Sequence, residues 1–126
     1  MPRARVDAIE ALIHQEVGRR ATALFTASKG GLWGAVSALA DAPPKYLGIL
    51  TGFFVPGGDP PAAETDGPAG AALLARAFAG LGVPCRLLTD EACGNACAAA
   101  LSGAGLPGVP VDRLAPECSP RTMIEA

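Results

Sequence analysis

The spacing of hydrophobic residues predicts four helices. Within each of them apolar side chains recur every three or four positions, as on a helix with one buried face. Pro68 suits the first position of the third helix, and Gly82 is placed to cap its end. Thr89 or Asp90 can cap the fourth helix through a side-chain oxygen. The helices are expected at residues 2–20, 32–41, 68–81 and 91–103, whereas residues 21–31 fit no period.

Apolar residues on consecutive positions predict strands instead. Tyr46–Val55 and Val83–Leu88 are typical of strands covered on both faces, and Val109–Val111 predicts a third strand that Pro110 weakens. Strands that alternate with helices through short connections favour parallel pairing with right-handed crossovers. We therefore expect an α/β fold, a three-layer Rossmann-like sandwich with a mainly parallel sheet. Three such strands leave open edges, so we also expect either a homodimer or one half of a larger domain.

Length and composition limit the class of protein. A chain of 126 residues fits one α/β domain, residues 1–126, and the stretch 115–126 is expected to be a disordered tail because it shows no period. The formal charge is −2 and the basic residues are scattered, so nucleic acid is a poor partner. No apolar run reaches about 18 residues, which argues against a membrane span. No apolar signal-peptide core follows the basic N-terminus, so a cytoplasmic protein is expected.

The four cysteines are expected to be reduced thiols because the chain lacks an export signal. Cys93 and Cys97 lie four positions apart on a predicted helix, but the single histidine, His14, is distant in sequence and no Cys-x-x-Cys pair occurs. We therefore predict free thiols without a metal. Residues 28–31, Ser-Lys-Gly-Gly, lack the spacing of a phosphate-binding P-loop, and Trp33 is expected in the core.

The loop Pro56–Gly67 is the candidate site. It follows a predicted buried strand, is rich in Gly and Pro, and carries two acids, Glu64 and Asp66, to the start of a helix. The free amides and the dipole at a helix start favour an anionic ligand. The two acids would then bind an ammonium group, hold Mg²⁺ or Mn²⁺, or act with one carboxyl group protonated. The alternative is that Asp66 only caps the helix and Glu64 is solvated.

Parallel strands end at one edge of a sheet, so the polar loops that follow them should meet there. We expect Glu64 and Asp66 to be the catalytic acids, the amides around Gly67 and Gly70 to bind an anion, and Asp112 to lie nearby. The remaining substrate contacts expected at this edge are Thr51, Gly52, Thr65, Thr89 and Asp90.

Three segments, TGFFVP, PPAAETDGPAGAALLARAFAGLG and LLTD, resemble the C-terminal domain of D-glutamate cyclase and its bacterial relatives. The resemblance runs from about Ile9 to Arg113 and is most specific at residues 53–56 and 64–68. Ala69 stands where the family pattern has a second proline. The family domain is longer than this chain, so the chain is expected to be its N-terminal half.

The resemblance implies an enzyme that converts D-glutamate to 5-oxo-D-proline with loss of water, with an amino-acid substrate and with Glu64 and Asp66 as its acids. It does not indicate which acid does what. Two alternatives stay open. One is a non-catalytic module that binds a small anion or a phosphorylated metabolite at the helix start, and the other is a fragment with neither function.

Overall fold

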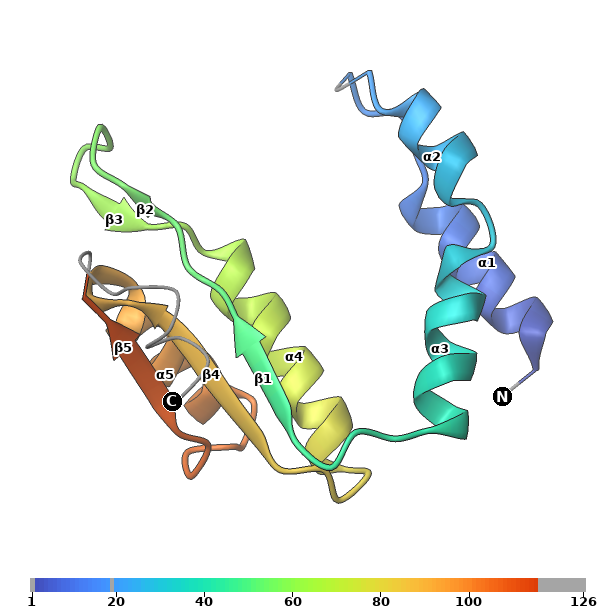
Figure 1. Cartoon of the computed structure of the whole chain (residues 1–126). Coiled ribbons are helices and arrows are strands. Elements are labelled where there is room, and N and C mark those ends of the chain that lie inside the picture. The colour runs from blue at the N-terminus through green and yellow to red at the C-terminus, as the bar shows by residue number, and fades with distance from the viewer. Residues whose placement is uncertain (1, 19, 116–126) are drawn as a thin grey trace. The chain divides into compact units, whose positions relative to one another are not determined.

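A computed structural model describes residues 2–18 and 20–115 (Figure 1). The chain divides into two compact units at the boundary between Pro44 and Lys45, and each unit is described by itself. The tail expected at residues 115–126 lies outside the described residues from residue 116 onward. No helix in the described ranges is long and apolar enough to cross a bilayer.

The first unit consists of three helices, of which α1 packs against α3. Val6 of α1 is buried, and the guanidinium of Arg3 lies 5.9 Å from the centre of the Trp33 ring on α3. Helix α3 confirms the helix predicted at residues 32–41. The elements are α1 (Arg3–Ile13), α2 (Thr22–Ser28) and α3 (Gly31–Asp41).

Helix α1 is shorter than the predicted helix, and α2 was not expected. The carboxylate of Glu16 accepts hydrogen bonds from the amides of Arg20 and Ala21, at 2.9 and 2.6 Å, directly before α2 begins. These bonds stabilise a non-helical connection at residues where the apolar period predicts helix. Ile13 and Val17, which this period places on a buried helix face, are 60% and 75% exposed. Helix α2 has only seven residues, which are too few for a period to be recognised.

The second unit is built on a parallel sheet with the strand order β1-β4-β5. Leu47 pairs with Cys85, and Leu87 pairs with Val111. Helix α4 connects β1 to β4, and a 3₁₀ turn, η1, and helix α5 connect β4 to β5. This arrangement confirms the α/β class and the parallel pairing. The elements are β1 (Leu47–Leu50), α4 (Asp66–Ala79), β4 (Cys85–Asp90), η1 (Glu91–Cys93), α5 (Gly94–Gly103) and β5 (Val111–Leu114).

Two strands differ from their predicted bounds because of backbone chemistry. β1 ends at Leu50 instead of Val55, since Gly52 adopts a φ of +119° and turns the chain out of the sheet. The residues beyond this turn form a small antiparallel hairpin, β2 (Phe54–Val55) with β3 (Ala62–Ala63), which extends past the end of the sheet in Figure 1. The third strand begins at Val111, after Pro110, which has no amide hydrogen to donate to a ladder.

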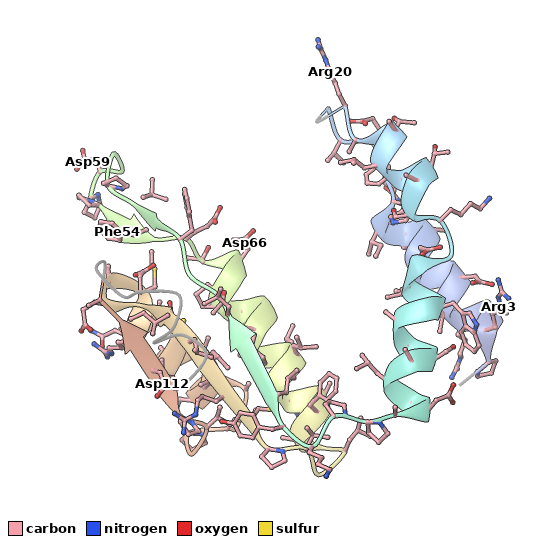
Figure 2. All side chains as sticks on the ribbon, viewed as in Figure 1. Arg3, Arg20, Phe54, Asp59, Asp66 and Asp112 are labelled. Carbon is pink, nitrogen blue, oxygen red and sulfur yellow. The ribbon has the colours of Figure 1, made fainter. Side chains whose placement is uncertain are left out.

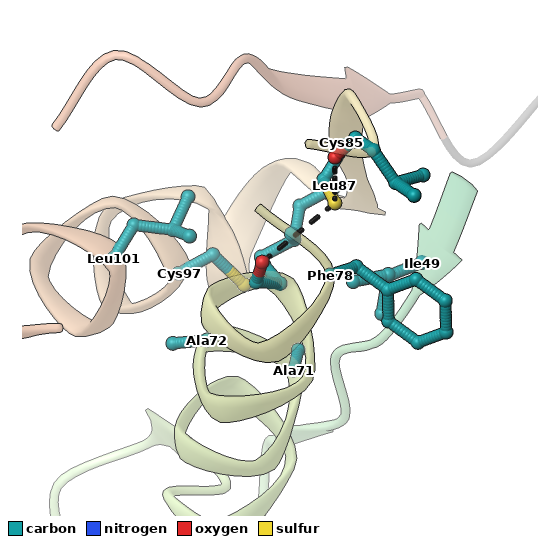
Figure 3. Packing of buried hydrophobic residues seen from close by; sticks show 10 residues of the cluster. Ile49, Ala71, Ala72, Phe78, Cys85, Leu87, Cys97 and Leu101 are labelled. Atoms are coloured by element: carbon teal, nitrogen blue, oxygen red, sulfur yellow. Dashed lines mark hydrogen bonds between the residues drawn. The ribbon is translucent and has the colours of Figure 1, made fainter. Parts of the chain in front are cut away.

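The core lies between the sheet and the helices α4 and α5, which also contact each other (Figure 3). Leu87 at the centre of the sheet, Ala75 of α4 and Cys97 of α5 are all 0% exposed. The Cys85 thiol donates to two carbonyls, that of Val83 at 3.3 Å and that of Ala75 at 3.7 Å, as the dashed lines in Figure 3 mark. Small side chains allow this close approach of helix and strand.

Both helices of the second unit cover the same face of its sheet. The strands follow one another in a single direction, and right-handed crossovers then place every connecting helix on one side. Residues 45–115 therefore form two layers, and the second helical layer of the predicted sandwich does not come from them. On the other face, Leu50 is 66% exposed.

Candidate functional site

An open depression of about 440 Å³ lies beside the carboxyl end of β1 and the first turns of α4. Five of the expected site residues line it, together with four apolar residues that form its walls. The expected residues are Thr51, Glu64, Asp66, Gly67 and Gly70. The apolar residues, which sequence reasoning did not assign to the site, are Ile49, Leu50, Ala71 and Leu74.

Local backbone contacts fix the two acids at this depression. The Glu64 amide donates to the Phe53 carbonyl at 2.7 Å, which ties the acidic segment to the chain leaving β1. Two residues later, the Asp66 carboxylate accepts a hydrogen bond from the Gly67 amide at 2.8 Å. A Cβ atom on Gly67 would lie 3.0 Å from the Thr51 hydroxyl oxygen, so glycine lets α4 begin close to the strand.

The depression is acidic. Glu64 and Asp66 are exposed and, within the described residues, neither forms an ion pair. Among the described residues, no Lys or Arg side chain lines the depression. Gly70 is the fifth residue of α4, so its amide donates within the helix and is not free to bind an anion as expected. Gly70 itself is exposed at the edge of the depression. A bound molecule would therefore meet two carboxylates, the Thr51 hydroxyl and an apolar wall.

The structure places Thr89 and Asp90 away from this depression. Thr89 points to the helix-covered face of β4 and is 1% exposed, and its hydroxyl has no hydrogen-bond partner among the described residues. The Asp90 carboxylate accepts a bond from the Cys93 amide at 2.7 Å and so caps η1, as the sequence predicted for one of these two residues. Gly52 separates both from the depression, since a Cβ atom there would touch the Thr89 hydroxyl and lie 3.2 Å from Asp90 Oδ2.

Thr65 and Asp112 have other surroundings. Thr65 is exposed at the N-cap position of α4, without a side-chain capping bond. Asp112 lies on β5, distant from Asp66 at the start of α4 in Figure 2, and accepts a bond from Arg86 at 2.8 Å. Arg86 also donates to the Tyr46 hydroxyl at 2.8 Å, and these bonds, that of Asp112 first, raise the pKa of Arg86. Asp112 therefore belongs to a hydrogen-bonded row of Tyr46, Arg86 and Asp112 on the face of the sheet opposite α4 and α5.

Three cysteines, Cys85, Cys93 and Cys97, lie in the described residues and are buried free thiols, whereas the fourth, Cys118, lies outside those residues. Burial raises the pKa of the Cys85 thiol, and burial together with a hydrogen bond to Asp90 raises that of Cys93. Such thiols stay protonated and are poor nucleophiles or metal ligands. Within the part of the chain that the structure describes, no three His, Cys, Asp or Glu side chains are grouped as metal ligands would be.

Fold and site together define an α/β protein with an acidic depression beside the carboxyl end of a parallel strand. The sequence matches the family described as D-glutamate cyclase-like, C-terminal, over residues 9–125, and the chain belongs to this family. Searches of curated proteins and of solved structures give no significant match.

Proposed function

We propose that this chain acts as a D-glutamate cyclase, forming 5-oxo-D-proline and water from D-glutamate at the depression beside β1 and α4. The family match over residues 9–125 supports the reaction class. The observation that carries the site is that Glu64 and Asp66 share one depression with the Thr51 hydroxyl. Cyclisation needs a base for the amine and an acid for the departing oxygen, and two neighbouring carboxyl groups can supply both.

The substrate would be oriented by charge and by its apolar chain. Its ammonium group is the part attracted by Glu64 and Asp66, because no basic side chain in residues 2–18 and 20–115 lines the depression to compete for them. Its methylene groups would lie against Leu50 and Leu74, which are 66% and 44% exposed. The Thr51 hydroxyl is the donor available to a substrate carboxyl group.

The chemical step forms one carbon–nitrogen bond and breaks one carbon–oxygen bond. One carboxylate of the pair takes a proton from the ammonium group, and the free amine attacks the γ-carboxyl carbon. The second carboxyl group gives a proton to the departing oxygen and then takes the second proton that the nitrogen loses, while the first carboxyl group passes its proton to the same oxygen. The oxygen leaves as water, and both acids return to their starting states. Negative charge nearby also favours the protonated form of the substrate's γ-carboxyl group, which is the better electrophile. Either Glu64 or Asp66 can take either role, since both are exposed at the depression.

The test is turnover of D-glutamate by the purified chain, followed by loss of the primary amine and by chromatography of the product. L-Glutamate serves as the stereochemical control, and parallel reactions with EDTA, Mg²⁺ and Mn²⁺ show whether a divalent ion takes part. Glu64→Gln and Asp66→Asn should each lower kcat/KM by about 100-fold or more, as expected for loss of general acid–base catalysis. The Asp66→Asn variant should lose only about 1 kcal/mol or less of stability, since Asn also serves at helix starts.

Asp59→Asn is the matched control. Asp59 is an exposed acid in the loop between β2 and β3 (Figure 2), outside the depression, and the change removes one charge without changing side-chain shape. Activity should stay at the level of the unaltered chain. No turnover by the unaltered chain, or normal turnover by both depression variants, would refute the proposal. Stabilisation by phosphate without turnover would favour the anion-binding alternative instead.

A further inference from the structure

The first unit contains a cavity of its own, of about 670 Å³, between α1, α2 and the connections at either end of α2. Its lining includes three acids, Asp7, Glu10 and Glu16, and also His14, Phe25 and Lys29. The family match includes most of this lining, but the description of the family gives the cavity no role. The protein's own hydrogen bonds determine which of its charged groups remain available to a ligand.

The three acids of the cavity are already engaged. Glu10 is 7% exposed and accepts bonds from the Leu32 amide at 2.9 Å and the Gly30 amide at 2.8 Å. These bonds, that of Leu32 first, lower the pKa of Glu10, which keeps it ionised and holds it at the start of α3. Glu16 accepts from the amides that precede α2, and also from the Thr22 hydroxyl at 3.2 Å.

Asp7 is the third acid, and its carboxylate lies 3.5 Å from Arg3 in an ion pair on α1. Lys29, in contrast, forms no direct ion pair with any residue in the described ranges, although its charge also contributes to the lowered pKa of Glu10. The imidazole of His14 stacks on the Phe25 ring, with centroids 5.0 Å apart and planes 14° from parallel. What the cavity leaves open is therefore a cationic donor and a flat aromatic surface.

We propose that this cavity binds a small carboxylate with a planar ring, the carboxylate at Lys29 and the ring against the His14–Phe25 stack. A charged donor recognises the carboxylate, and ring stacking contributes apolar contact with defined geometry. The carboxylate of Asp7 is paired with Arg3, and those of Glu10 and Glu16 accept backbone hydrogen bonds, so the lone pairs of these acids are turned toward the protein and not toward a ligand at Lys29. The proposal does not depend on the cyclase reaction, which is assigned to the other unit.

His14 is the only histidine of the chain, so its ring C–H resonances in a proton NMR spectrum are assigned without ambiguity. Benzoate, titrated at constant pH and ionic strength, should shift these resonances saturably. Benzylamine, with the opposite charge, and benzamide, without charge, should not. Acetate should bind more weakly than benzoate because it lacks the ring.

The chain has only two lysines, which provide a matched pair of variants. Lys29→Ala should weaken benzoate binding about tenfold, the worth of one charge-assisted contact, whereas Lys45→Ala in the other unit should leave it unchanged. Lys29→Arg should retain most of the affinity, which separates loss of charge from loss of fold. The proposal is overturned if benzoate gives no saturable shift, if benzylamine or acetate binds as well, or if Lys29→Ala and Lys45→Ala behave alike.

Discussion

Replacing Thr89 with valine is expected to stabilise the second unit. Thr89 is 1% exposed on β4, and its hydroxyl has no hydrogen-bond partner in the part of the chain that the structure describes. A buried polar group without a partner costs about 1–3 kcal/mol, and valine has nearly the same shape without that group. The hydroxyl faces the Cα of Gly52, where a weak C–H contact returns roughly 0.5–1 kcal/mol. The net gain should be about 1 kcal/mol.

Urea unfolding followed by far-UV circular dichroism measures this change. For a small protein with a slope of about 1–3 kcal/mol per molar urea, the midpoint should rise by roughly 0.5 M at an unchanged slope. Thr89→Ser keeps the hydroxyl but loses a buried methyl group, so it should shift the midpoint the other way. Thr65→Val, on an exposed threonine, should change stability by less than about 0.5 kcal/mol. A Thr89→Val protein less stable than the unaltered chain would show that the hydroxyl is in fact paired.

Three further predictions concern stability and assembly. Glu10 has a pKa below its ordinary value of 4.5, so its stabilising effect is present above that value and is lost as pH falls through the lower folded pKa. Glu10→Gln should therefore lower the melting temperature at pH 7, and the melting temperature of the variant should fall less steeply as the pH is lowered. An equal fall in melting temperature for the two proteins would contradict this. Leu87→Ala, at a 0% exposed position, should cost about 2–5 kcal/mol in urea unfolding, and a loss below about 1 kcal/mol would place Leu87 outside the core. Both β1 and β5 are edge strands, and an edge favours association, so light scattering should show a dimer instead of a stable monomer.

The sequence predicts the second unit better than the first. In β4 and α4 the apolar pattern predicts both elements apart from a few terminal residues, although α4 begins at Asp66, two residues before Pro68, and its C-cap is Gly80 instead of Gly82. In the first unit the apolar period alone cannot show that the Glu16 carboxylate binds the amides before α2. That contact depends on a side chain reaching along the backbone, which hydrophobic spacing does not record.

The candidate site is predictable where it follows from one strand–loop–helix connection. Thr51, Glu64 and Asp66 meet because β1 and α4 are joined by the loop that carries the acids. Thr89 and Asp90 also stand at a carboxyl end, but alternation along β4 turns Thr89 toward the helices, and capping engages Asp90. Position at the edge of a sheet can be inferred from sequence, whereas the direction of each side chain depends on register.

The single tryptophan and the single tyrosine of the chain lie on opposite sides of the boundary between Pro44 and Lys45. Trp33 stands beneath Arg3 in the first unit, and Tyr46 accepts a bond from Arg86 in the second. Each unit thus carries its own optical reporter, without any label. If the fluorescence of Trp33 and that of Tyr46 change at the same denaturant concentration, the units unfold cooperatively as one domain. If they separate, the boundary divides two domains, and each can be produced and studied alone.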